Sequence, residues 1–349
     1  LATCHTSLVP SLFIIFSPMI AFFKLIRLPN LLIMAFTQYM VRWCLLIPTM
    51  ELKRHDLDYS LLDVQMTEFD FFLLVLATVM IGAAGYIIND YFDVRIDGVN
   101  RPDTNLVGKK IKRRVAMGAH MTINFIGAGL GIYLSWKYNF FRVGASLFIA
   151  VPAMLWIYST NLKRRFLVGN IVIALLSAIV PLIVVLFEIP NIHNAFPEFV
   201  SAGYLSLSDV FRFTLFIALF AFVITLLREI IKDVEDYEGD MEYGCKTMPI
   251  VIGIARTKIV LAGICAMVIA GIGWLQYLQF IAEEWASLSY FSFLLQLPLL
   301  YLSYRVLNAK GKKDWHFCSV LVKIIMVGGI SYLFLYAHQI HNLIAGDVS

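Results

Sequence analysis

Charged residues are scarce in this chain of 349 residues: Asp, Glu, Lys and Arg together make up 15% of it, against 60% for hydrophobic residues. Soluble domains carry about 25% charged residues. The composition therefore excludes a soluble globular protein and predicts an integral membrane protein. The formal net charge of +4 gives no evidence for a nucleic-acid partner.

Patterns of disulfide or transition-metal sites are also missing. The five cysteines have no paired spacing and lie mostly in apolar runs, as small buried hydrophobic residues do. The seven histidines show none of the spacings that bind zinc or copper. The N-terminus lacks the basic start and small-residue cleavage site of a signal peptide. We expect instead that residues 1–28 form an interfacial segment, with Pro10 and Pro18 interrupting its apolar run.

Long apolar runs are plentiful. Nine of them approach the roughly 20 residues that a spanning helix needs, at 29–48, 69–88, 115–135, 140–158, 168–187, 209–231, 257–280, 287–307 and 316–340. These runs leave no room for a soluble domain. We therefore predict an all-α fold, a polytopic membrane bundle of about nine transmembrane helices, as a single domain over residues 29–349.

Basic residues indicate how the bundle is oriented. They gather at Lys24 and Arg27 and in the loops at 98–114, 159–167 and 306–315, whereas the loops at 188–208 and 281–286 contain no Lys or Arg. Loops rich in basic residues stay in the cytoplasm. We therefore expect the basic loops, together with 232–256, to face the cytoplasm, and the loops at 49–68, 188–208 and 281–286 to face the other side.

Two groups of aspartates follow apolar runs on this basic side. Asp90, Asp93 and Asp97 come directly after the second run, and Asp233, Asp236 and Asp240 repeat the spacing after the sixth. On a helix, residues at i, i+3 and i+7 share one face. Charges at membrane depth are costly and usually face a cavity, a partner or an ion. Mg²⁺ is typically held by carboxylates and substrate phosphates, so the two motifs predict a diphosphate–Mg²⁺ site.

Basic and polar residues accompany both motifs. Arg228 and Lys232 are spaced to clamp a phosphate or to pair with Glu229 and Asp236 on their own helix. Gly239 is expected to end that helix, which would present Asp240 from a loop. Lys163, at the end of the fourth run, is a candidate for diphosphate contact, while Arg164 and Arg165 fit membrane anchors.

Two further elements border the predicted site. Tyr158 is placed to orient Lys163 or an acceptor hydroxyl. Arg27 and Asn30 could line the mouth of a cavity or anchor the first span. A transporter with an aspartate-lined ion path is the main alternative of another class, but transporter sites commonly lie near the membrane midplane. A catalytically silent isoprenoid-binding scaffold is a third reading.

These residues resemble the motifs of UbiA-type membrane prenyltransferases. Asn89, Asp90, Asp93 and Asp97 match the family's N-D-x-x-D-x-x-x-D, and the second triad matches its D-x-x-D-x-x-x-D. The stretch at 246–250 is similar to the basic-Thr-Leu-Pro stretch that often follows. The wording of both motifs resembles the digeranylgeranylglyceryl phosphate synthase branch, although 104–108 and the long loops at 49–68 and 188–208 depart from it.

The resemblance implies a function and a site. It implies a helical bundle whose central cavity opens to the cytoplasmic side and holds an isoprenyl diphosphate through Mg²⁺. The implied reaction transfers an isoprenyl group, with geranylgeranyl expected, to a lipid acceptor such as geranylgeranylglyceryl phosphate, or alternatively to an aromatic ring, in the cell inner membrane. The predicted site comprises catalytic residues Asp93, Asp236, Lys163 and Tyr158, diphosphate ligands Asn89, Arg27, Asn30, Arg95, Arg228, Lys232 and Lys163, and metal ligands Asp90, Asp93, Asp97, Asp233, Asp236 and Asp240.

Overall fold

The structure, a computed structural model, describes residues 19–100 and 105–346. Within these residues, nine helices are long and apolar enough to cross a membrane, and the only strand-like pairing is an isolated bridge between Val107 and Ile111. The predicted all-α bundle of about nine spans is confirmed. Residues 19–25 are helical, and the rest of the expected interfacial segment 1–28 lies mostly outside the described residues.

Each span starts within a few residues of its expected position. The first consists of α2 (Leu28–Met40), the π-helical turn η1 (Val41–Leu46) and α3 (Ile47–Leu57); the others are α4 (Glu68–Asn100), α5 (Arg113–Lys137), α6 (Phe141–Thr160), α7 (Val168–Ala195), α9 (Ser208–Glu235), α12 (Ile254–Ile281), α13 (Trp285–Phe291) continued by η3 (Ser292–Gln296) and α14 (Leu297–Asn308), and α15 (Lys312–Gly346). Short helices η2 (Leu162–Arg164), α8 (Pro197–Ser201), α10 (Tyr237–Glu242) and α11 (Met248–Ile252) lie between spans.

Several helices run well beyond the predicted apolar runs. The second span was expected at 69–88, yet α4 continues through the first aspartate motif to Asn100. A helix satisfies its own backbone hydrogen bonds, so it continues outside the bilayer wherever the sequence permits. Pro152 in α6 and Pro181 and Pro190 in α7 lie inside spans. Transmembrane helices tolerate such prolines because neighbouring groups satisfy the freed backbone.

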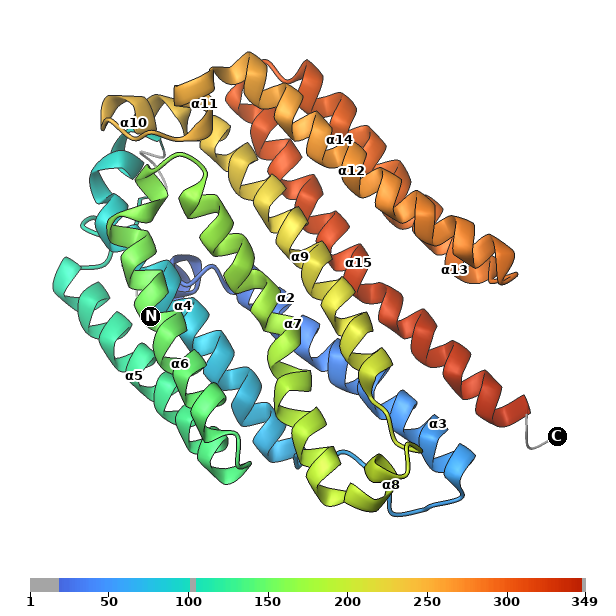
Figure 1. Cartoon of the computed structure of the whole chain (residues 1–349). Helices are drawn as coiled ribbons and strands as arrows, with labels where there is room; N and C mark the ends of the chain where they lie inside the picture. The colour runs from blue at the N-terminus through green and yellow to red at the C-terminus, as the bar shows by residue number, and fades with distance from the viewer. Residues whose placement is uncertain (1–18, 101–104, 347–349) are drawn as a thin grey trace, which may run out of the picture.

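The ends of the spans sort to two ends of the bundle (Figure 1). Helices α10 and α11 lie at one end, and α8 lies at the opposite end beside the end of α3. Helix α10, which follows the second aspartate motif, packs against α4, which carries the first. The two motifs are therefore at the same end of the molecule, as the predicted count of three spans between them requires.

The opposite end, which we call the closed end, is held by a network of charged side chains in which Arg42, Asp70 and Glu188 are buried and Glu68 and Lys137 are exposed. Arg42 and Glu188 are almost fully buried and form an ion pair, and Arg42 also donates to Glu68 at 3.0 Å. The backbone amide of Gln65 donates to Glu188 at 3.0 Å. Lys137 pairs with Asp70 at 2.7 Å. These bonds join η1, α4, α5, α7 and the loop before α4.

Candidate functional site

The first aspartate motif is bonded to basic side chains from other elements. Arg27 donates to Asp90 at 2.8 Å, and its guanidinium lies 5.0 Å from the centre of the Tyr86 ring. Lys163 donates to Asp93 at 2.6 Å and to Asn89 at 3.2 Å. Arg27 sits at φ 52°, a left-handed conformation that non-glycine residues rarely adopt. The chain thus turns sharply into α2 where it delivers this guanidinium to α4.

The second motif is divided between two helices. Helix α9 ends at Glu235, just after Asp233, which accepts a hydrogen bond from Asn170 on α7 at 2.9 Å. Asp236 lies at the junction, and Asp240 belongs to α10. The expectation that Gly239 ends the helix and leaves Asp240 in a loop is wrong. The helix breaks earlier, at Asp236, so the three aspartates do not share one uninterrupted helix face.

Gly239 instead allows α10 to pack closely against Asn100 at the end of α4. Its amide donates to the Asn100 side chain at 2.8 Å, and a Cβ at this position would lie only 2.6 Å from that side chain. The carbonyl of Asn100 also accepts a hydrogen bond from Lys312 at the start of α15. Asn100, which is 5% exposed, therefore joins the end of the first motif to the second motif and to the last span.

Carboxylates of both motifs contribute to the electrostatic environment of Asp240. Burial raises the pKa of Asp240 to about 7, and the neighbouring carboxylates of Asp236, Asp93 and Asp97 add to the effect, while Lys163 opposes it. Like charges disfavour ionisation of one another. Aspartates from both motifs thus meet in one electrostatic environment, where a cation would relieve their repulsion.

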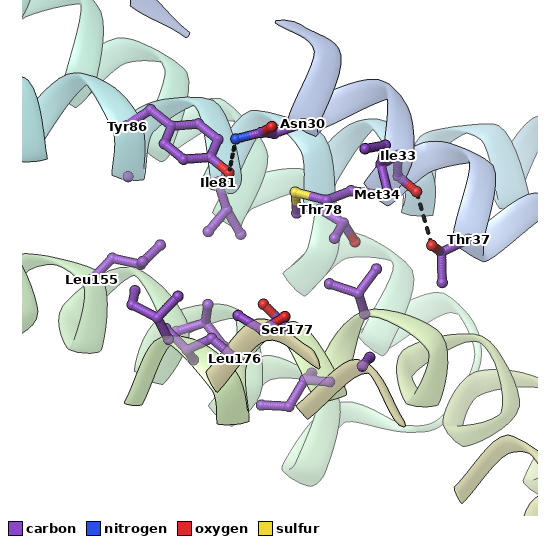
Figure 2. A pocket seen from close by; sticks show the side chains of 18 of the residues that line it. Asn30, Ile33, Met34, Thr37, Thr78, Ile81, Tyr86, Leu155, Leu176 and Ser177 are labelled. Carbon is purple, nitrogen blue, oxygen red and sulfur yellow. Dashed lines mark hydrogen bonds between the residues drawn. The ribbon is translucent and has the colours of Figure 1, made fainter. Parts of the chain in front are cut away.

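A cavity extends from this end into the bundle between α2, α4, α6, α7, α9 and α15 (Figure 2). Helices α5, α12 and α14 do not contribute to its lining. At its polar end Asn30 donates to the Tyr86 hydroxyl at 3.1 Å. Figure 2 shows Leu155 and Leu176 on the wall that faces these residues.

The deeper part of the cavity is apolar. Its walls are lined by aliphatic residues and methionine, namely Leu147, Val151, Leu155, Ile173, Ile183, Met326 and Ile330. The aromatic side chains that line the cavity are Tyr86, Phe148, Tyr158 and Phe220. The lining reaches Thr37, Thr78 and Val180, where Gln38 donates to the Thr78 hydroxyl at 3.1 Å and to the Val180 carbonyl at 3.3 Å. Beyond this level lies the packed core that leads to the closed end.

Basic groups on α9 and α15 lie between the aspartates and the apolar part. Arg228 donates to Glu229 at 2.7 Å, and the Lys232 ammonium lies 3.7 Å from the same carboxylate. Lys323 of α15 lines the cavity as well. The carboxylate of Glu229 is therefore shared by two cations. The local pairing expected for Arg228 and Lys232 is present with Glu229, and both residues also line the cavity, so the phosphate contact expected of them stays a prediction.

The structure brings most predicted site residues together. Arg27, Asn30, Asn89, Tyr158, Arg228 and Lys232 line the cavity, and Lys163 reaches Asn89 and Asp93 from beside it. The six aspartates stand at the polar end without lining the cavity themselves. Arg95 is exposed on α4 and lies outside the lining, so it is not part of the site that we propose.

Other residues at the site were not predicted. Lys323 and Tyr86 line the cavity, Asn170 bonds Asp233, and Asn100 joins the motifs. Lys323 could have been predicted from the sequence, because it is the only Lys, Arg, Asp or Glu within the apolar run 316–340. Asn100 and Asn170 could not, since their partners lie 139 and 63 residues away in the chain.

The donor set fits a hard divalent cation. All six candidate ligands are carboxylates, and oxygen ligands are what Mg²⁺ takes. Among the described residues no three His, Cys, Asp or Glu side chains are grouped closely enough to hold a metal ion. Mg²⁺ usually keeps several waters and completes its shell with substrate phosphates. The arrangement therefore suits a metal that binds together with a phosphorylated substrate.

Comparison with known proteins agrees with this geometry. The model of the UbiA prenyltransferase family matches residues 62–327, which include both aspartate motifs and most of the cavity lining. The chain belongs to the UbiA prenyltransferase family. It is an integral membrane protein, as its nine spans and its family membership agree.

Two relatives within the UbiA family are digeranylgeranylglyceryl phosphate synthases. The one from Pyrococcus abyssi is 36% identical over 188 residues, which cover 54% of this chain and 58% of the relative. The one from Thermococcus kodakarensis is 30% identical over 261 residues, which cover 72% of this chain and 80% of the relative. The match to the first thus spans about three fifths of that relative's length.

Solved UbiA structures share the fold. An apo UbiA homologue from Aeropyrum pernix K1 superposes with a TM-score of 0.56 at 16% identity, covering 84% of this chain and 96% of the homologue. A homologue from Archaeoglobus fulgidus bound to GPP and Mg²⁺ superposes with a TM-score of 0.50 at 15% identity, covering 90% and 99%. At these identities the likeness concerns the helical bundle alone.

Proposed function

We propose that this protein is a Mg²⁺-dependent intramembrane prenyltransferase that moves an isoprenyl group from a polyprenyl diphosphate, with geranylgeranyl diphosphate favoured, to a lipid acceptor. One observation carries the proposal: aspartates from two distant segments meet at the polar end of a cavity whose deeper walls are apolar. The polar end suits a diphosphate with its metal ions, and the apolar part suits an isoprenoid tail. A path for ions would not need a cavity with apolar walls of this kind.

The donor substrate would be held at its charged end by both signs of charge. Asp90, Asp93, Asp97, Asp233, Asp236 and Asp240 are the proposed metal ligands. Arg27 and Lys163, which bond the first motif, and Lys232 on α9 are placed to contact diphosphate oxygens. Mg²⁺, when bound, would neutralise charge on the diphosphate and so make it a better leaving group. The homologue from Archaeoglobus fulgidus, which shares the bundle, was solved with GPP and Mg²⁺ bound, and this supports a site for an isoprenyl diphosphate and Mg²⁺ without identifying its residues.

Residues of this chain would assist the breaking of the bond between C1 and the diphosphate oxygen. Arg27, Lys163 and Lys232 oppose the charge that builds on the departing diphosphate. Tyr86 and Tyr158 line the cavity near the first motif, and aromatic rings of this kind can stabilise the allylic cation at C1. The acceptor hydroxyl then forms the new bond to C1, and its proton passes to the departing diphosphate. The apolar walls keep water from taking the acceptor's place.

Geranylgeranylglyceryl phosphate is the acceptor that we favour, because the relatives from Pyrococcus abyssi and Thermococcus kodakarensis are both named digeranylgeranylglyceryl phosphate synthase. An aromatic quinone precursor is the alternative acceptor. A direct test is to give the purified protein Mg²⁺, geranylgeranyl diphosphate and either acceptor, and to identify the product by mass. We expect the digeranylgeranyl lipid, and no product when the metal is chelated. Prenylation of the ring alone would overturn the acceptor assignment, and full turnover in excess chelator would overturn the metal site.

We also propose that the site faces the cytoplasm of a cell inner membrane, on the basis of the basic loops, and that residues 29–349 act as one domain after an interfacial segment 1–28. The test is cysteine labelling in a cysteine-free background. Gly108 has a φ of 88°, which disfavours any other residue, so the exposed Lys110 is the better position. An impermeant thiol reagent on intact cells should label Ser201→Cys and spare Lys110→Cys. The reverse pattern would invert the topology.

A further inference from the structure

Lys323 is a charged residue inside a membrane-spanning helix, and it takes no part in the ion pairs described for the site. It is half-buried on α15 and lines the cavity. Among the described residues it has neither a hydrogen bond nor an ion pair, unlike Arg27, Lys163 and Arg228. Glu229, the only carboxylate in the cavity lining, is already shared by Arg228 and Lys232. A lysine at membrane depth without a partner is costly and points to a ligand.

A second unsatisfied donor belongs to Arg228. Its Nε is buried and has no hydrogen-bond partner, while its Nη1 bonds Glu229. We call the end of the bundle that carries the six aspartates the metal end. Arg228 precedes Asp233 by five residues on α9, which places it roughly 7 Å along the helix away from the metal end. Arg228 and Lys323 both line the cavity below the aspartates, but the Nε of Arg228 is enclosed by protein atoms, so of these two described residues only Lys323 offers an unpaired donor to the cavity. The next lining residues of α15 are the apolar Met326 and Ile330.

This level is where the acceptor must react. With the diphosphate at the aspartates and the tail in the apolar part, the reacting carbon C1 lies between them. A hydroxyl that attacks C1 brings the rest of its head group to the same level. The diphosphate already has Arg27, Lys163 and the metal ligands, whereas an anionic group on the acceptor would find the ammonium of Lys323.

We infer that Lys323 binds the phosphate group of the acceptor lipid and thereby selects an anionic acceptor. The inference rests on the proposed prenyl transfer and adds the head-group subsite. Lysine and arginine are the usual ligands of phosphate oxygens. Lys323 would then be a specificity residue, and its ammonium would gain a partner only when the acceptor is bound.

The test compares two acceptors that differ by the phosphate alone, geranylgeranylglyceryl phosphate and geranylgeranylglycerol. We expect Lys323→Met to lower kcat/KM for the phosphorylated acceptor by roughly tenfold to a hundredfold, because it removes a hydrogen bond between two charged groups. Turnover of the neutral acceptor and the KM for geranylgeranyl diphosphate should stay within about twofold of wild type. Lys323→Arg should keep most of the preference, and Lys323→Gln should lose it.

Lys313→Met is the matched control, because Lys313 is exposed on the same helix and lies outside the cavity. It should leave both acceptors unaffected. An equal rise in KM for the prenyl diphosphate in Lys323→Met would assign Lys323 to the donor and overturn the inference, as would an unchanged preference for the phosphate. A wild-type protein that prenylates neither acceptor would instead refute the proposed function itself, and the inference with it.

Discussion

Both ends of the bundle contain clustered charges, but the two clusters are built differently. At the closed end, Arg42 and Glu188 are 1% and 0% exposed and pair with each other and with backbone groups. At the metal end, the side chains of Lys163 and Asp93 are 10% and 15% exposed and those of Arg27 and Asp90 are 26% and 19% exposed. The ions of one end are sealed, and those of the other end stand beside a cavity.

The difference separates structural from functional charge. A sealed pair satisfies itself, and its removal leaves a buried charge behind. At the metal end Arg27 and Lys163 bond Asp90 and Asp93 beside the cavity, and Lys323 forms neither a hydrogen bond nor an ion pair among the described residues. Charges that remain incompletely satisfied in the protein alone are those available to a substrate.

The largest expected effect on stability is at the closed end. Glu188→Ala would leave Arg42 with only the exposed Glu68 as a carboxylate partner, at a cost of about 3 kcal/mol in the free energy of unfolding. Thermal unfolding in detergent measures this loss. Replacing Arg42 and Glu188 together by Met should cost less than the single change. Activity per folded molecule should not change, and a stable but inactive Glu188→Ala protein would contradict the division between the ends.

At the metal end the main effect should be on turnover. Asp93→Ala and Asp236→Ala are each expected to lower kcat by roughly a hundredfold or more, about 2.7 kcal/mol in the activation barrier, because both are proposed metal ligands. Unfolding temperatures should stay close to wild type. Glu68→Ala, at the closed end, is the control and should retain its activity. Near-normal rates in either aspartate variant would remove that residue from the site.

Gly239→Ala should have an intermediate effect that is confined to the metal end. The added methyl group would clash with Asn100, and overpacking of this kind costs roughly 1–3 kcal/mol. We expect α10 to shift and turnover to fall by about tenfold, or 1.4 kcal/mol. Adding Asn100→Ala should relieve the clash and recover part of the rate. Gly118→Ala has open space around its Cβ and should behave as wild type.

The smallest effect should come from a charge pair that belongs to neither cluster. Arg212 and Asp209 form an ion pair at 3.5 Å with side chains that are 72% and 88% exposed. Exposed pairs of this kind contribute about 0–1 kcal/mol. Asp209→Ala should therefore leave both the unfolding temperature and turnover within experimental error. A clear loss of either would show that burial does not decide which charges matter in this bundle.

The fold could be predicted because it depends on local sequence. Each span is a long apolar run, and the count of spans fixes which helix ends meet. The lengths of the helices were less predictable, since α4 continues to Asn100 and the first span to Leu57 through polar residues. Those extensions depend on hydrogen bonds inside the helix, and hydrophobicity does not report them.

The predictable part of the site consists of charged residues near the ends of the apolar runs. Arg27 and Lys163 bond aspartates of the first motif, and Asp93 and Asp97 lie near enough to Asp240 to affect its pKa, whereas the metal and diphosphate roles of these residues stay predictions. The break at Asp236 and the contact of Gly239 with Asn100 were not predictable, because they depend on how α10 docks against α4. Pairing between residues 139 positions apart leaves no pattern in a single sequence.

The hydrogen bonds of Gln38 have a consequence for the size of the substrate. They tie α2, α4 and α7 together at the level of Thr78, which is the deepest residue that α4 contributes to the cavity lining. From Thr78 to Asn89 the helix α4 rises roughly 16 Å. With the diphosphate bound at the aspartates as proposed, this rise is the length of α4 along which a straight isoprenoid chain would lie.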